Sequence, residues 1–192
     1  MTRQTSTPVT PRGLYHVSEQ RGLVRFEPRA ESGGAVWAIT AERLKNYLLP
    51  RDCPRVTFYA RAATTADDRA RFLGESTAVV AIESAWYERA VVARVFVYAF
   101  DAVPFELADE IAGYYTTYEA VDAIGCREIE NPIAELLRDQ VEVRLLPSLW
   151  ALREAVASST LGFSVIRMRN AAPPPAGFES RFPVYSPGAE LR

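Results

Sequence analysis

The stretch GLYHVSEQRGLVRFEPRAESGGAVWAI, residues 13–39, contains three short segments rich in β-branched and aromatic residues. Such composition favours β-strands, and the three segments are Leu14–Ser18, Leu23–Phe26 and Ala35–Ile39. Pro28 ends the second segment, and Gly33 and Gly34 provide a turn before the third. The intervals are too short for helical crossovers, so successive strands are expected to pair antiparallel.

Further strands and helices alternate irregularly along the rest of the chain. The composition predicts strands at Arg55–Arg61, Thr77–Ile82, Ala90–Phe100, Gly113–Thr117, Glu119–Val121, Val141–Leu146 and Phe163–Arg169. Helix signals predict helices at Ala41–Leu48 after Thr40, at Asp67–Leu73, at Pro132–Arg138 after Asn131, and from Ser148 to Ala157. Strands outnumber helices, which favours an α+β fold of mostly antiparallel or mixed sheets with flanking helices.

The length of 192 residues suits one domain with a sizeable core. We expect this single α+β domain to span residues 13–170. Residues 1–12 are polar and contain two prolines, which predicts a flexible lead. Residues 171–192 begin with a run of three prolines and predict an extended arm, for which contact with a partner chain is one hypothesis.

Composition excludes several classes of function. The net charge of −2 provides no broad basic field, so nucleic-acid binding is not indicated. No apolar stretch approaches the ~20 residues of a membrane span, and no signal peptide is evident, which predicts a cytoplasmic protein. Cys53 and Cys126 are far apart and His16 is the only histidine, so we expect reduced thiols and no metal site.

Arginine supplies nearly all the positive charge, because Lys45 is the only lysine. Coding bias explains this composition, and so does recognition of phosphate or carboxylate by forked guanidinium groups. Arg51 and Arg55 lie four residues apart on a proline-framed loop, where they could clamp such an anion. The alternative is that both arginines pair with Asp52 and fix the loop.

His16 is the first candidate for a functional side chain. Strand alternation places it on one face with Leu14 and Ser18, where its ring could orient a ligand hydroxyl. The alternative is a histidine at the edge of the core, satisfied by a backbone carbonyl. A Cys53 nucleophile with His16 as its base has little support, because no helix N-terminus lowers the pKa of that thiol.

The segment Gly113–Glu119 is the second candidate. Tyr114, Tyr115 and Tyr118 offer stacking faces, and Glu119 adds a carboxylate. This combination suits a nucleoside or a nicotinamide ring, because a carboxylate stabilises the positive charge that develops on the attached ribose. The alternative is that the aromatic residues only favour a strand and that Glu119 is a solvated turn residue.

Two resemblances to known families rest on these residues. The chain resembles a small bacterial family of proteins of unknown function through LYHVSE (14–19), VWAI (36–39), PRDCPRV (50–56), GYYTTYEAV (113–121) and FSVIRMRNA (163–171). More distantly, LYHVS, GAVWAI and YYTTYEAV resemble motifs of ADP-ribosyltransferase-like domains, which have a histidine in an early strand and a glutamate that begins a later one. The second resemblance implies a split sheet.

The second resemblance also implies NAD as co-substrate and a glycosyltransferase of the ADP-ribosyltransferase type. His16 would hold the adenosine-side ribose, and Glu119 would act on the nicotinamide ribose. The aromatic residues that would contact the ligand are Trp37 with Tyr115 or Tyr118, and Tyr47 and Tyr114 are alternatives. Val17 departs from the usual glycine, and Trp37 from the usual tyrosine or phenylalanine. The competing functions are a non-catalytic nucleotide- or anion-binding domain, using Arg51 and Arg55, and an interaction module.

Overall fold

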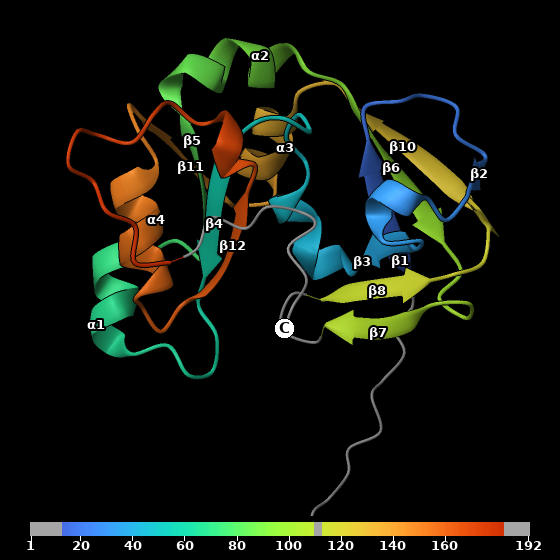
Figure 1. Ribbon diagram of the computed structural model, residues 1–192, viewed down its shortest axis with the longest axis horizontal. Helices are drawn as coiled ribbons and strands as arrows, with labels where there is room; N and C mark the ends of the chain where they lie inside the picture. Colours follow the sequence, from blue (N-terminus) through green and yellow to red (C-terminus); the bar gives the residue numbers. More distant parts are fainter. Residues whose placement is uncertain (1–12, 110–112, 183–192) are drawn as a thin grey trace, which may run out of the picture. The chain divides into compact units, whose positions relative to one another are not determined.

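The computed structural model describes residues 13–109 and 113–182. The predicted lead, residues 1–12, and the end of the predicted arm, residues 183–192, lie outside the described residues. Contacts divide the chain into two compact units: unit 1 comprises Met1–Leu44 and Phe96–Glu128, and unit 2 comprises Lys45–Val95 and Ile129–Arg192. Helices accompany antiparallel and mixed sheets, which confirms the α+β class (Figure 1).

Unit 1 contains a six-stranded sheet. Its strands, in spatial order, are β10 (Gly125–Ile129), β6 (Val95–Phe100), β1 (Leu14–Ser18), β3 (Val36–Ile39), β8 (Tyr114–Thr117) and β7 (Glu106–Asp109). Strand β1 pairs antiparallel with both β6 and β3, and β8 pairs antiparallel with both β3 and β7. The first and third predicted strands thus pair antiparallel, whereas β2 (Arg25–Phe26), which lies between them in the sequence, pairs with neither and belongs to another sheet.

A two-stranded ribbon covers one face of this sheet. It consists of β2 (Arg25–Phe26) and β9 (Val121–Asp122), which pair antiparallel. The ring of Phe26 meets the rings of Tyr98 and Phe100 edge-on, with centroids 5.2 and 4.9 Å away. Phe26 and Val121 thus join the ribbon to the hydrophobic core of unit 1.

Unit 2 is built on a mixed four-stranded sheet. The order is β11 (Glu142–Leu146), β5 (Ala78–Glu83), β4 (Arg55–Tyr59) and β12 (Gly162–Ile166), with β11 parallel to β5 and the other pairs antiparallel. Figure 1 shows α1 (Ala66–Asp68) and α4 (Trp150–Ala157) on one side of this sheet and α3 (Pro132–Arg138) on the other. Val56, Phe58, Trp150 and Val156 belong to the core between the sheet and α4.

The helix predicted after Asn131 is confirmed. The side chain of Asn131 accepts a hydrogen bond from the backbone N–H of Ala134 at 2.9 Å, and Pro132 occupies the start of α3. The predicted helix from Ser148 to Ala157 is also present as α4, and Ser148 Oγ accepts a hydrogen bond from the N–H of Trp150 at 3.4 Å. The predicted cap of α3 is therefore confirmed, whereas the N-cap of α4 is Leu149, one residue after Ser148, and makes no side-chain cap hydrogen bond.

Two strand predictions are wrong in part. The segment predicted as one strand over Ala90–Phe100 divides into helix α2 (Tyr87–Val92) and strand β6, because Val92 is exposed and has no sheet to pack against. The predicted pairing of Gly113–Thr117 with Glu119–Val121 does not form. Instead, β8 pairs with β3 and β7, whereas β9 crosses to β2, since tertiary contacts outweigh sequence proximity.

The helix predicted over Ala41–Leu48 is a shorter 3-10 helix, η2 (Ala41–Asn46). The segment predicted as a helix over Asp67–Leu73 is α1 followed by a π-helical turn, η3 (Arg69–Leu73). Strands β7 and β10 are not predicted by the sequence pattern, because every residue of β7 is exposed and most residues of β10 are exposed and polar or small. Edge strands of this kind lack the apolar alternation on which sequence prediction depends.

Phe26→Ala is expected to destabilise unit 1. The substitution removes the ring that joins the ribbon to Tyr98 and Phe100, and truncating a buried phenylalanine costs about 3 kcal/mol of unfolding free energy. Urea denaturation followed by tryptophan fluorescence measures this loss. Val24→Ala is the control on the same ribbon, because Val24 is 70% exposed and should change stability by less than about 0.5 kcal/mol.

Candidate functional site

His16 lies in the middle of β1, opposite Tyr98 of β6. Its Nδ1 atom is 3.0 Å from the backbone carbonyl oxygen of Trp37, and its ring meets the edge of Phe26 at a centroid distance of 5.2 Å. One ring nitrogen is thus engaged by the backbone, and the imidazole lies at the margin of the core. These contacts match the structural alternative for His16 and leave its ligand role a prediction.

The indole of Trp37 lies on the opposite face of the sheet from His16. The pairing of Tyr15 with Ile39 makes His16 and Ala38 lateral neighbours on one face, so the intervening Trp37 points the other way. Its ring is 41% exposed, donates from Nε1 to the carbonyl oxygen of Ser32 at 2.8 Å, and meets Tyr114 edge-on. Only the backbone of Trp37 therefore meets His16.

Tyr115 and Thr117 share the face of the sheet that carries His16. Tyr115 pairs with Ala38 across β3 and packs partly buried against the core of unit 1. Thr117 Oγ1 accepts a hydrogen bond from the backbone N–H of Glu119 at 3.2 Å, at the point where the chain leaves β8 for the ribbon. Glu119 and Tyr118 are exposed there.

Arg55 serves the structure of its own loop. Its side chain is buried, with 2% of the residue exposed, and its guanidinium donates to three carbonyl oxygens: those of Asn46 at 2.7 Å, Pro50 at 3.0 Å and Cys53 at 2.9 Å. This geometry differs from both sequence interpretations, since the described bonds go to backbone carbonyls. Arg55 therefore does not form an exposed clamp with Arg51.

Arg51 belongs instead to a different group of arginines, in unit 2. Arg167 Nε donates to the carbonyl oxygen of Arg51 at 3.2 Å, and Asn170 Nδ2 donates to the carbonyl oxygen of Asp52 at 2.8 Å. These two bonds fasten the turn after β12 to the loop before β4. We call Arg51, Arg167 and Arg169 the arginine cluster.

The charges of the arginine cluster act on one another. Burial lowers the pKa of Arg167 from its ordinary value, and the positive charges of Arg169 and Arg51 lower it further, whereas the carboxylate of Asp52 opposes the shift. Arg167 also adopts the left-handed backbone region, with a φ of 57°, which is uncommon for a non-glycine residue. Three positive charges thus lie close together, and Asp52 is the one acidic residue among the groups that shift the pKa of Arg167.

Sequence reasoning found Arg51 but not its partners. The last predicted strand, Phe163–Arg169, includes Arg167 and Arg169, whereas β12 ends at Ile166 and the 3-10 helix η5 (Met168–Asn170) follows. The signal available in the sequence was the alternation of arginine in IRMRN (166–170). That alternation indicates two arginines close together, but not the loop that they meet.

A family model matches residues 15–171 of the sequence. The chain belongs to the family of unknown function DUF6886. The predicted membership of a family of unknown function is thereby confirmed, and the matched range includes His16, Glu119 and the arginine cluster. No curated protein and no solved structure matches the chain.

Cys53 is buried, and its thiol is far from reactive. Burial raises the pKa of Cys53 to about 11, although the positive charges of Arg55 and Arg89 partly oppose this. Across residues 13–109 and 113–182, no three histidine, cysteine or acidic side chains form a group that could hold a metal ion. Among the same residues, no helix is long and apolar enough to cross a membrane.

The two cysteines are expected to differ sharply toward a thiol reagent. At about pH 8 the buried thiol of Cys53 stays protonated, whereas Cys126 is exposed, so the native protein should react at one thiol per chain. Ellman's reagent measures this, with denaturant added afterwards to reveal the second thiol. Rapid modification of a Cys126→Ser variant without denaturant would contradict the burial of Cys53.

Proposed function

We propose that this chain is a non-catalytic binding domain that takes a phosphate- or carboxylate-bearing ligand at the arginine cluster. The observation that carries the proposal is the pair of hydrogen bonds from Arg167 to the carbonyl of Arg51 and from Asn170 to the carbonyl of Asp52. They hold two segments distant in sequence together although both bear positive charge. A bound anion would relieve the repulsion that results.

The chemistry of the cluster supports an anion over other ligands. Guanidinium groups present several N–H donors in a fixed plane, which matches the oxygens of phosphate and carboxylate. Arg51 and Arg169 are exposed, so a ligand in solution can reach them. A nucleotide belongs to this ligand class through its phosphates.

Arg169→Gln is expected to weaken anion binding. Titration calorimetry at low ionic strength, with inorganic pyrophosphate and with citrate, should give an affinity at least about tenfold lower than that of the wild type. Arg69→Gln is the matched control, because Arg69 is another exposed arginine of unit 2 and lies outside the cluster. Equal losses in both variants, or no binding of either anion by the wild type, would contradict the proposal.

A second function, ADP-ribosyl transfer or NAD hydrolysis, is favoured by one feature of unit 1. His16, Tyr115 and Thr117 share one face of the sheet, and Thr117 Oγ1 accepts from the backbone N–H of Glu119, which precedes β9 rather than beginning it. In this proposal the Glu119 carboxylate holds a ribose hydroxyl while the bond between ribose and nicotinamide breaks. Nicotinamide leaves with the electron pair, and an acceptor or water attacks the cationic ribose.

Glu119→Gln tests this second function. If the carboxylate stabilises the departing ribose cation, the substitution should lower nicotinamide release from NAD at least about 100-fold, as measured by proton NMR. Glu106→Gln is the control, because Glu106 is an exposed glutamate on the edge strand β7 of the same unit. Equal background rates in the wild type and in Glu119→Gln would eliminate the enzyme and leave the anion-binding proposal unaffected.

A further inference from the structure

The chain beyond the last 3-10 helix is held against unit 2 at two places. At the first, the backbone N–H of Ala172 donates to the buried carboxylate of Glu83, at 2.9 and 3.1 Å to its two oxygens. The carbonyl oxygen of the same residue accepts from Trp150 Nε1 at 2.7 Å. Both polar groups of one peptide residue are thus bound by side chains, which fixes the start of the arm.

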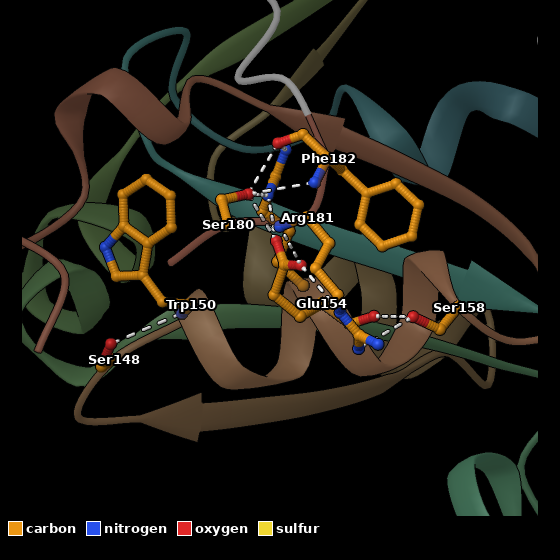
Figure 2. A network of polar contacts seen from close by, with 8 residues as sticks. Ser148, Trp150, Glu154, Ser158, Ser180, Arg181 and Phe182 are labelled. Atoms are coloured by element: carbon orange, nitrogen blue, oxygen red, sulfur yellow. Dashed lines mark hydrogen bonds and ion pairs between the residues drawn. The ribbon is translucent and has the colours of Figure 1, made fainter. Parts of the chain in front are cut away.

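The second place lies along α4 and is shown in Figure 2. Glu154 accepts hydrogen bonds from Ser180 Oγ at 2.7 Å and from the backbone N–H of Arg181 at 3.0 Å. Arg153 donates to Ser180 Oγ at 2.6 Å and to the carbonyl oxygen of Phe182 at 3.0 Å. We call Trp150, Arg153, Glu154 and Ser158 the α4 site.

The α4 site recognises an extended peptide backbone. Arg153 and Glu154 are only 4% and 7% exposed, they form an ion pair with each other, and each also binds a backbone atom of the arm. Ser158 Oγ accepts from Arg181 Nη2 at 3.3 Å, and the ring of Phe178 lies 5.7 Å from that of Trp150. A carboxylate for an N–H, a guanidinium for a carbonyl and an aromatic contact are typical means of peptide recognition.

The arm supplies hydrogen bonds to the ion pair of Arg153 and Glu154 and so affects the ionisation of Glu154. Burial opposes ionisation of Glu154, but hydrogen bonds from Ser180 and Arg181 and the charges of Arg153 and Arg181 together hold the pKa of that carboxyl below its ordinary value. Without the arm, hydrogen-bond partners of both buried charges would be lost, and a poorly satisfied buried charge is costly. The α4 site is therefore suited to a segment that offers a backbone N–H and a carbonyl.

The segment between the two places is exposed. Residues 173–177 include Pro173, Pro174 and Pro175, and every one of the five is open to solvent. The three prolines form a semi-rigid spacer. A turn follows at Ala176 and Gly177, where the N–H of Phe178 donates to the carbonyl oxygen of Pro175 at 2.9 Å and Gly177 has a φ of 75°. This turn is the hinge, and with it opened the five residues would span roughly 16 Å, enough for the end of the arm to leave one molecule for another.

We propose that the α4 site is a peptide-binding site that also accepts residues 178–182 of a second copy of this chain. The contacts in the exchanged form are those that the arm makes in its own chain, so exchange creates no new interface chemistry. The hinge connects the arm to its own α4 site at an effective concentration of the order of mM, so a single chain closes on itself when dilute. Exchange prevails when the chain's own arm cannot occupy its own site.

Two full-length variants isolate the exchange. The first, Arg153→Met with Glu154→Met, removes both buried charges together and so avoids an unpaired one, and it keeps an intact arm. The second, Phe178→Ala with Arg181→Pro, removes the aromatic contact and the N–H that Glu154 binds, and it keeps an intact α4 site. Each variant therefore closes on itself through residues 178–182 more weakly than the wild type does.

Sedimentation velocity at about 100 µM of each chain is the readout, well below the effective concentration of a tethered arm. We expect each variant alone to be monomeric and their mixture to form a one-to-one dimer. Monomers in the mixture would overturn the proposal. Dimers of either variant alone would overturn it too, because they would have to form through another surface.

A peptide keeps the test decisive if the doubly substituted α4 variant does not fold. The variant with Phe178→Ala and Arg181→Pro serves as the receptor, and a synthetic peptide of residues 172–182 is the probe. We expect saturable binding by fluorescence anisotropy, at least about tenfold tighter than that of a peptide carrying Ser180→Ala and Arg181→Pro. Equal affinity for the two peptides, or no binding, would overturn the proposal.

Discussion

The buried guanidinium of Arg55 holds the loop before β4 in place and thereby positions the arginine cluster of unit 2. Its bonds to the carbonyl oxygens of Asn46, Pro50 and Cys53 close the loop that leads into β4. Arg55 is also the first residue of β4, where it pairs with Ile166 at the end of β12. The residue after Ile166 is Arg167, so the register that places Arg55 also brings Arg167 to the loop that carries Arg51. Without the closed loop, Arg51 would not be held close to Arg167 and Arg169.

Much of the fold could be predicted because its signals are local. The cap of α3 and the apolar strands β1, β4 and β5 depend on neighbours within a few residues, and these are visible in the sequence. The segment from Ala90 shows the limit of such signals. Its valines favour a strand, but Val92 is exposed and the chain turns as helix α2 there. Which segment pairs with which is decided by long-range contacts that no local pattern contains.

The candidate sites also depend on long-range contacts that the sequence pattern does not contain. The loop PRDCPR could be recognised as polar and proline-framed, but not which arginine turns inward, because Arg51 and Arg55 have similar sequence surroundings. Burial distinguishes them: Arg55 is satisfied by backbone carbonyls, whereas Arg51 stays exposed beside Arg167. For His16 the sequence left two interpretations, and the carbonyl of Trp37 with the ring of Phe26 accounts for the structural one.

Three arginine environments in unit 2 differ in the groups that balance the positive charge. The positive charge of Arg55 is stabilised by carbonyl dipoles, and that of Arg153 by the carboxylate of Glu154 and a carbonyl of the arm. In both cases the partners are already part of the chain, so an external anion would have to displace well-made hydrogen bonds. In the arginine cluster, Arg167 is bound to a carbonyl but still experiences the repulsion of Arg51 and Arg169, against the single carboxylate of Asp52. An anion bound there, as we propose, would be attracted by all three guanidinium groups.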